Sequence, residues 1–289
     1  MDKALPRDAT DHESLESIPF GDALRAWRQE RRQSQLALSL AAGVSQRHLS
    51  FLESGRARPS RLMVLQLAEA LDLPLRQRNQ LLIAAGFAPS YPKRTLAHPD
   101  MTPIRSALDM LLHHHRPYPA VVIDRHWNIT LMNPPMQRML ALLGDIEAIW
   151  TTVCGEGPRN LLKLTMHPAG ARPSILNWEE VATLLLWRTR HEAEAHCDAE
   201  LHALVDEVLQ YEGVPRRWRL HEPPEGVPAP VLPVRYGVGG AELSLFSMLS
   251  SFGTALDVTA DEIRVETFLP TNAASEALLR QLDAQEPSP

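Results

Sequence analysis

The stretch of residues 35–54, QLALSLAAGVSQRHLSFLES, decides the fold of the first part of the chain. Gly43 stands where a tight turn between two helices needs a positive φ angle, and Ser45 is a typical N-cap for the helix that follows. Leu38 before the turn and Leu49 after it are spaced so that the two helices can bury them against each other. The pattern predicts a helix, a tight turn and a second helix.

The second of these helices carries polar side chains on its outer face, close to its start. Gln46 and Arg47 are side chains that bond base edges in the major groove, and Phe51 offers an apolar surface to a thymine methyl. Gln35 can place its amide and nearby backbone N–H groups on a phosphate, and later arginines can add phosphate contacts. The predicted DNA-binding residues are Gln35, Ser45, Gln46, Arg47, Ser50, Phe51, Arg56 and Arg58.

Charge is distributed unevenly along the 289 residues, whose formal net charge is −6. Residues 20–94 carry 12 basic and five acidic side chains, a net charge of +7, whereas residues 95–289 carry −10 and residues 1–19 carry −3. A compact basic segment joined to a larger acidic one indicates a nucleic-acid partner for the basic segment. A helical bundle of this kind can also serve protein contacts alone, as in an antitoxin-like module, and the pattern leaves that alternative open.

The first segment resembles a known family. The run 24–73 contains WRQER at 27–31, SQ at 34–35, AGVS at 42–45, LESG at 52–55 and PS at 59–60, and it is similar to the Cro/C1-type helix-turn-helix of XRE-family regulators. The resemblance implies a five-helix, lambda-repressor-like domain that binds a palindromic double-stranded DNA operator as a homodimer. It also implies that Arg28 and Glu53 form a structural pair inside the domain. Ser39 departs from the family pattern, where alanine is usual, but is small enough to fit.

Domain boundaries follow from changes in the pattern. Residues 1–19 lack apolar periodicity and are expected to be a disordered leader, and residues 20–87 are helical throughout. Residues 88–101 contain Pro89, Pro92 and Pro99 and are expected to be a linker. Residues 102–270 form the second predicted domain, and residues 271–289 a C-terminal helix and tail.

The second domain mixes strand and helix patterns. Strands are predicted at 120–123, 127–132, 231–238, 243–252 and 263–269, with a proline-rich loop before the third. Helices are predicted from residue 102, at 134–143, 179–195, 200–211 and 272–282. Two strands, several helices and three further strands predict an α+β domain with an antiparallel sheet.

This domain also carries a resemblance. The run YPAVVIDRHWN at 118–128, with Asn133, looks like the opening of a PAS-like domain. The later runs NLLKL at 160–164, HP at 167–168, RP at 172–173, NWEEV at 177–181 and residues 254–268 are similar to the MmyB-like ligand-binding domain. That resemblance implies a sensor of a small apolar, fatty-acid-like molecule.

Apolar side chains in the second domain are sufficient to line a pocket. A sheet covered by aromatic-rich helices can leave a cavity for an apolar molecule, although the same side chains can simply fill a core. The predicted pocket residues are Trp127, Leu131, Leu162, Trp178, Val181, Leu185, Phe246 and Met248.

Motifs of other classes are missing from the sequence. There is no Walker loop, no GxSxG and no HExxH, and His191 and His196 are five residues apart, so we expect no enzyme, metal site or cofactor. The acidic N-terminus is not a signal peptide, and no apolar run reaches the roughly 18 residues of a membrane helix. Cys154 and Cys197 are too few for a disulfide framework. We expect a cytoplasmic protein.

Overall fold

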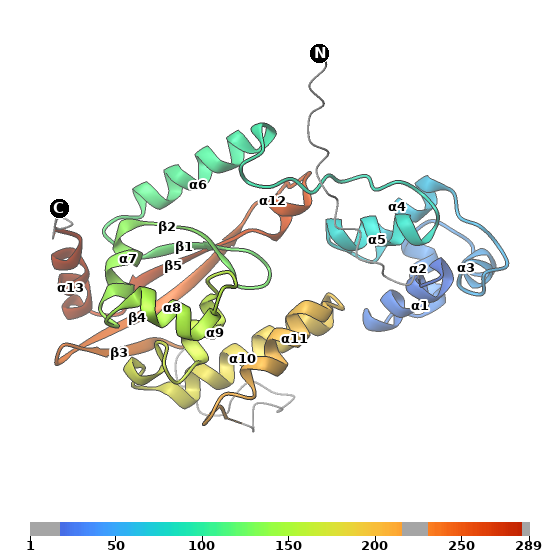
Figure 1. Ribbon diagram of the computed structural model, residues 1–289. Helices are drawn as coiled ribbons and strands as arrows, with labels where there is room; N and C mark the ends of the chain where they lie inside the picture. The colour runs from blue at the N-terminus through green and yellow to red at the C-terminus, as the bar shows by residue number, and fades with distance from the viewer. Residues whose placement is uncertain (1–17, 216–230, 285–289) are drawn as a thin grey trace, which may run out of the picture. The chain divides into compact units, whose positions relative to one another are not determined.

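The computed structural model describes residues 18–215 and 231–284, and these divide into two compact units at Tyr91 and Pro92 (Figure 1). The predicted leader lies almost entirely outside the described residues, as do most of the proline-rich loop and the last five residues. Among the described residues, no helix is long and apolar enough to cross a membrane.

The first unit consists of five helices. They are α1 (Phe20–Glu30), α2 (Gln35–Ala41), α3 (Gln46–Glu53), α4 (Arg61–Ala70) and α5 (Leu75–Ala84). Serines begin three of them: the hydroxyls of Ser34, Ser45 and Ser60 each accept a hydrogen bond from the backbone N–H three residues further on. Such caps satisfy N–H groups that a helix leaves free at its start.

The core of the first unit is made of leucines from all five helices, and Leu24, Leu38, Leu49 and Leu82 are fully buried in it. The start of α1 packs closely on the end of α3, because a Cβ at Gly21 would lie 2.7 Å from the carbonyl oxygens of α3 residues. A side chain at this position would therefore separate the two helices.

The second unit combines a sheet with further helices. Its strands are β1 (Ala120–Ile123), β2 (Ile129–Met132), β3 (Val234–Val238), β4 (Ala241–Ser251) and β5 (Arg264–Pro270). Its α-helices are α6 (Thr102–His114), α7 (Pro134–Ala141), α8 (Ile146–Cys154), α9 (Leu161–Met166), α10 (Trp178–Ala195), α11 (Ala199–Val208), α12 (Val258–Glu262) and α13 (Ala273–Ala284). Two 3-10 turns, Pro99–Met101 and Arg172–Ser174, complete it.

The five strands form one antiparallel sheet in the order β2-β1-β5-β4-β3. The first two strands and the last three are thus separated in sequence by the helical segment, and they meet where β1 pairs with β5. β3 and β4 are joined through Gly239 and Gly240, both with positive φ, which suits a tight hairpin.

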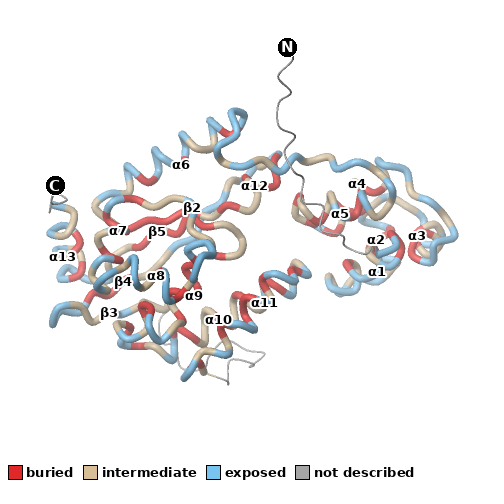
Figure 2. Tube along the Cα trace, in the orientation of Figure 1, coloured by how far each residue is buried: buried red, intermediate tan, exposed pale blue. Residues whose placement is uncertain are grey.

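Helices cover the sheet on both faces (Figure 2). On one face, Leu108 and Leu112 of α6 pack on Val122 and Val265. On the other, a larger core joins side chains of β1, β4 and β5 to the helices α7, α8, α9 and α10. The alternation of side chains along each strand therefore assigns odd and even positions of β4 to two different environments.

The segment predicted as a linker is bonded at both of its ends. Asn79 of α5 accepts hydrogen bonds from the backbone N–H groups of Ser90 and Tyr91, within the first unit. In the second unit, the carbonyl of Pro92 accepts from Val258, and Arg94 forms an ion pair with Asp257. Within residues 88–101, each part is thus attached to its own unit.

Candidate nucleic-acid interface and ligand cavity

The helix-turn-helix of the first unit presents the N-terminal part of α3 to solvent. Gly43, with φ of +67°, makes the turn, and Ser45 caps α3 by accepting a hydrogen bond from His48. Leu49 and Leu52 of α3 are fully buried, which leaves Gln46 and Arg47 on the exposed side. Helix α3 is therefore oriented by its buried leucines.

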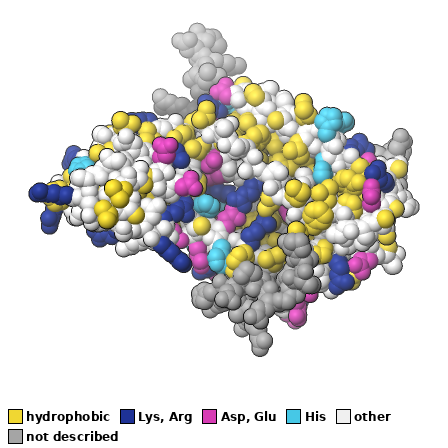
Figure 3. Space-filling view, turned by 180° about the vertical axis from the view of Figure 1, so that it is seen from behind, with side chains coloured by type: hydrophobic (Ala, Val, Ile, Leu, Met, Phe, Trp, Pro, Cys, Tyr) yellow, Lys and Arg dark blue, Asp and Glu magenta, His cyan; other side chains and the backbone are white. Residues whose placement is uncertain are grey.

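Further residues predicted to contact DNA lie on the surface beside this helix. Arg47 stacks its guanidinium over the ring of Phe51 at 5.4 Å from the ring centroid, and both Ser50 and Phe51 are half-buried. Arg56 and Arg58 are exposed in the segment after α3. Basic side chains project from this unit in Figure 3. The stacking supports the arginine in an extended position, where a base edge or a phosphate can be reached.

Glu53 is the centre of a bonded network behind this surface. Its side chain is fully buried and accepts from Arg28 through Nε at 2.6 Å and Nη2 at 2.9 Å. Burial raises the pKa of Glu53, but hydrogen bonds from Arg28 and Gln35 outweigh it, so the pKa lies below its usual range. The ion pair joins α1 to α3 and fixes the helix that presents Gln46 and Arg47.

Gln35 belongs to the same network. Its amide nitrogen donates to Glu53 Oε2 at 2.8 Å, so one of its two N–H groups is bonded inside the unit. The contact of Gln35 with a phosphate stays a prediction.

In the second unit, a cavity of about 200 Å³ lies between the sheet and the helices α7, α9 and α10. Its wall is mainly apolar. The helices contribute Met136, Met139, Leu140, Leu161, Leu164, Val181, Leu184 and Leu185, and the sheet contributes Val234, Val238, Leu243 and Phe268.

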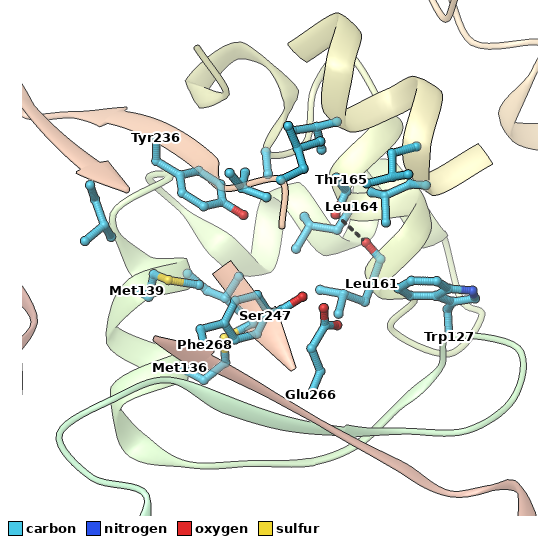
Figure 4. A pocket seen from close by; sticks show the side chains of 18 of the residues that line it. Trp127, Met136, Met139, Leu161, Leu164, Thr165, Tyr236, Ser247, Glu266 and Phe268 are labelled. Atoms are coloured by element: carbon cyan, nitrogen blue, oxygen red, sulfur yellow. Dashed lines mark hydrogen bonds between the residues drawn. The ribbon is translucent and has the colours of Figure 1, made fainter. Parts of the chain in front are cut away.

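Polar side chains gather on one part of this wall. Figure 4 shows the hydroxyls of Tyr236 and Ser247 and the carboxyl of Glu266 pointing toward the interior of the cavity. Burial raises the pKa of Glu266 above its usual range, while a hydrogen bond with Ser247 and the charge of Arg188 oppose that shift only in part. The wall thus includes a carboxyl group whose surroundings favour its neutral form.

Arg188 of α10 faces Glu266 from the helical layer. Its guanidinium stacks on the Trp127 ring at 4.9 Å from the centroid, and burial lowers its pKa. Within the described part of the chain, its Nη2 atom is buried without a hydrogen-bond partner. A buried N–H group with no acceptor is costly, so this atom is a place where a ligand oxygen can bind with gain.

Three of the predicted pocket residues line the cavity: Trp127, Val181 and Leu185. Leu162 is fully buried in the core, and Trp178 is half-buried under the guanidinium of Arg172, 4.9 Å from its ring centroid. The prediction that the pocket is lined by Leu131, Phe246 and Met248 is wrong. They lie on the other face of the sheet, since strand alternation directs Leu243 and Ser247, and not their even-numbered neighbours, toward the cavity.

Sequence reasoning missed the polar members of the wall, namely Arg188, Tyr236, Ser247 and Glu266. A signal for two of them was present. Glu266 is the single carboxylate of a central strand, between Val265 and Thr267, and Arg188 directly follows the apolar run 184–187 of α10. Charged side chains at such positions are rarely buried without a partner or a function.

The turn that carries Trp127 is attached to the helical layer by a second buried carboxylate. Asp198 caps α11 by accepting from Leu201, and it also binds His126 Nε2 and Arg125 Nη1, each at 3.2 Å. Burial raises the pKa of Asp198, but these hydrogen bonds and charges outweigh it and lower the pKa to about 2. Trp127 itself has a φ of +67°, in the left-handed region, next to this cluster.

Metal-ligating side chains do not converge in the part of the chain that the structure describes: no group of three or more His, Cys, Asp or Glu residues is placed to hold an ion.

An exposed helix in a helix-turn-helix unit, followed by an α+β unit with a walled cavity, defines a transcriptional regulator with a DNA-binding part and a ligand-binding part. A family model for the MmyB-like transcription regulator ligand binding domain matches residues 104–282, and a helix-turn-helix model matches residues 24–77. The chain therefore belongs to the MmyB-like transcription regulators and not to an enzyme family. The prediction of a five-helix helix-turn-helix domain followed by an α+β domain with an antiparallel sheet is confirmed.

Curated relatives include uncharacterized HTH-type transcriptional regulators of Mycobacterium tuberculosis and Mycobacterium bovis, each 35% identical over 138 residues. The match covers 47% of this chain and 50% of each relative, so the chain spans about half the length of the curated relatives it matches. A solved structure of an RNA-binding Light-Oxygen-Voltage receptor is 12% identical with a TM-score of 0.24, covering 96% of this chain and 67% of that chain. A likeness at that score carries no inference.

Proposed function

We propose that residues 20–87 bind a palindromic operator as a homodimer, and that the second unit senses a small apolar ligand of the fatty-acid type. Ligand binding then shifts the population of dimers able to bind DNA. The observation that carries the ligand half of the proposal is the cavity of about 200 Å³ with an apolar wall built from both layers of the unit.

The DNA-binding half rests on the surface of α3. Gln46 and Arg47 are exposed at its start, Arg56 and Arg58 are exposed after it, and residues 20–91 of the unit carry 10 basic and five acidic side chains, a net charge of +5. A recognition helix reads bases with its N-terminal residues, and flanking arginines bind phosphates. Two such units in a dimer reach half-sites about 34 Å apart, which is one turn of DNA.

The ligand half rests on the size and chemistry of the cavity. An apolar cavity of about 150 Å³ is sufficient to bind benzene, so a space of this order admits a small apolar molecule. The lining by methionine and leucine side chains from α7, α9 and α10 allows the wall to adapt to a flexible chain.

The alternative is an antitoxin-like module that uses its helices for protein contacts and has a structural second unit without a ligand. Gln46 and Arg47 are polar and charged side chains on the exposed side of α3. They favour the DNA-binding proposal, because a protein-binding surface is usually depleted in charge at its centre.

A gel-shift assay with DNA from upstream of its own gene or a neighbouring gene tests the first half. Arg47→Ala is expected to weaken binding to the shifted sequence by about 1–3 kcal/mol and to leave binding to unrelated DNA nearly unchanged. Arg56→Ala is the comparison, since loss of a phosphate contact weakens all sequences alike and lowers the salt dependence. The absence of any sequence-specific shift at moderate salt contradicts the proposal.

Native mass spectrometry of freshly purified protein, followed by titration with decanoic acid, tests the second half. We expect a bound lipid-like molecule or saturable binding of decanoic acid, and loss of both in Val181→Trp, which fills the cavity from α10. Leu131→Trp, on the other face of the sheet, is the matched control and should bind normally. Protein that carries no ligand and binds no decanoic acid supports the alternative.

A further inference from the structure

The polar part of the cavity wall contains a half-buried arginine and a buried carboxyl group from opposite layers. Arg188 lies on α10 and Glu266 on β5, and both line the cavity. Their charges interact, yet Nη2 of Arg188 has no hydrogen-bond partner among the described residues. The space between the layers is therefore bounded by a guanidinium with a buried Nη2 atom and by one buried carboxyl.

Neighbouring carboxylates do not fully neutralise the charge of Arg188. Glu192, one turn further along α10, is bonded to Arg264 of β5. The charges and titratable groups that surround Glu266 and Arg188 are Glu192 on α10, Tyr236 on β3 and Arg264 on β5, with His191 and His196 further along the adjoining groove. Glu266 itself is buried, which favours its neutral form, so the guanidinium of Arg188 lacks a full counter-charge.

We propose that Arg188 and Glu266 form a subsite for the carboxylic-acid head of the ligand, in which the ligand carboxyl and Glu266 share a single proton. This inference rests on the proposed function, since it assigns the head of the apolar molecule that the cavity binds. One ligand oxygen accepts from Arg188, and the other accepts the O–H of neutral Glu266.

The charge balance explains why one proton is shared. Two carboxyl groups and one guanidinium in a buried space hold one negative and one positive charge when a single proton remains on the carboxyl pair. Where Glu266 of the empty protein is ionised, binding of the carboxylate takes up one proton from solvent. No covalent bond other than that O–H changes.

The position of Arg188 also orients the ligand. The same side chain lines a surface groove together with His191, Leu249 and Arg264, so it lies at the boundary between groove and cavity. The acid head thus lies near the groove, and the chain extends toward the methionine and leucine wall. The cavity volume limits that chain to on the order of ten carbon atoms, judged from the volume that a benzene ring needs.

A ligand series tests the role of Arg188. Decanoic acid, 1-decanol and decanamide are titrated into the full-length chain by calorimetry. We expect decanoic acid to bind at least about tenfold more tightly than the two neutral molecules, and Arg188→Met to abolish this preference. Arg190→Met is the matched control on the same helix, because Arg190 is bonded to Glu194 outside the cavity and should have no effect.

Variants of Glu266 test the shared proton. Glu266→Gln keeps an N–H donor at every pH, so it should bind decanoic acid within about threefold of the wild type near pH 7. Glu266→Leu has no donor and should lose about tenfold or more. Between about pH 6 and about pH 9, the wild-type affinity falls once the pH exceeds the pKa of Glu266 in the empty protein, by up to about tenfold per pH unit, whereas the Gln variant stays level.

The outcomes separate the two proposals. If decanoic acid and 1-decanol bind equally tightly and Arg188→Met changes neither, the head subsite is wrong while the apolar-ligand proposal stands. If Glu266→Gln binds decanoic acid as poorly as Glu266→Leu, with melting curves that match the wild type, a donor at position 266 does not support binding, and the hydrogen bond from neutral Glu266 to the ligand is excluded. If none of the three molecules binds, the ligand part of the proposed function itself fails.

Discussion

Each unit of this regulator contains a half-buried arginine and a buried glutamate whose charges interact, but the two pairs differ in how many of their hydrogen bonds are made. In the first unit, Glu53 accepts from Arg28 at 2.6 and 2.9 Å and from Gln35 at 2.8 Å. In the second, Arg188 and Glu266 face a cavity, and an N–H group of Arg188 has no partner among the described residues.

The difference shows how the same residue types serve structure in one place and binding in another. A pair whose donors and acceptors are all bonded holds two helices at a fixed distance, and its pKa shifts favour the charged form of the acid. In the Arg188–Glu266 pair, burial favours the neutral form of the acid, and an N–H group of the arginine stays available for a ligand. Completion of the hydrogen bonds, and not burial alone, separates the two roles.

The largest effect is expected when the charge of Glu53 in the Arg28–Glu53 pair is removed without a change in side-chain size. Glu53→Gln leaves the guanidinium of Arg28 buried without its anion, so we expect the first unit to lose about 3–5 kcal/mol of unfolding free energy. Chemical denaturation followed by far-UV circular dichroism measures this loss. Glu69→Gln, an exposed glutamate on α4, is the control and should change stability by less than about 0.5 kcal/mol.

A result near zero for Glu53→Gln means that Gln35 and Arg28 rearrange around a neutral amide. The pair would then not be the element that fixes α3 against α1.

The second test concerns Asp198 of the second unit, which is a buried carboxylate with bonded partners, as Glu53 is in the first unit. Its pKa of about 2 in the folded protein lies below its ordinary value of 3.8, so the stabilisation is present above pH 3.8 and is lost as the pH falls toward 2. Asp198→Asn should therefore cost about 2 kcal/mol near neutral pH and flatten the acid limb of the stability curve. Thermal melting between about pH 2 and about pH 7 provides the measurement.

Asp206→Asn, an exposed aspartate on α11, should keep the wild-type pH dependence. An Asp198→Asn variant whose stability changes with acid as steeply as the wild type would show that other carboxyl groups carry the effect.

The sequence predicted the helix-turn-helix unit better than the cavity of the second unit. Local signals, such as Gly43 with Ser45 and the family-like positions of Arg28 and Glu53, were sufficient for the helix-turn-helix, because each acts over a few residues or one helix contact. The bounds of β1 at Ala120–Ile123 also followed from its apolar run. Helices α8 and α9 were missed, since α9 has only six residues and its pattern lies in a stretch rich in glycine and proline.

The cavity could not be assigned from sequence, because it depends on which face of each strand meets the helices. Alternation places Phe246 and Met248 together on one face of β4, but it does not tell which face meets the helices, and the odd positions Leu243 and Ser247 face the interior. Pairing of β1 with β5 places Ala120 opposite Thr267, 147 residues further along the chain, and no local pattern gives the register of such distant segments.

The smallest expected effect, and the one that completes the comparison, is that of Glu266→Gln on stability. Since the pKa of Glu266 in the folded protein is raised, the wild type loses stability as the pH rises above the ordinary value of 4.5, where the unfolded chain ionises first. The Gln variant has no such loss, so its melting temperature should equal the wild type near pH 4.5 and exceed it slightly near pH 8. The sign is opposite to that expected for Glu53→Gln, although both substitutions exchange a buried carboxyl for an amide. If both variants are destabilised alike, Glu266 is held in its charged form by hydrogen bonds, as Glu53 is. The Arg188–Glu266 pair is then a structural pair like Arg28–Glu53.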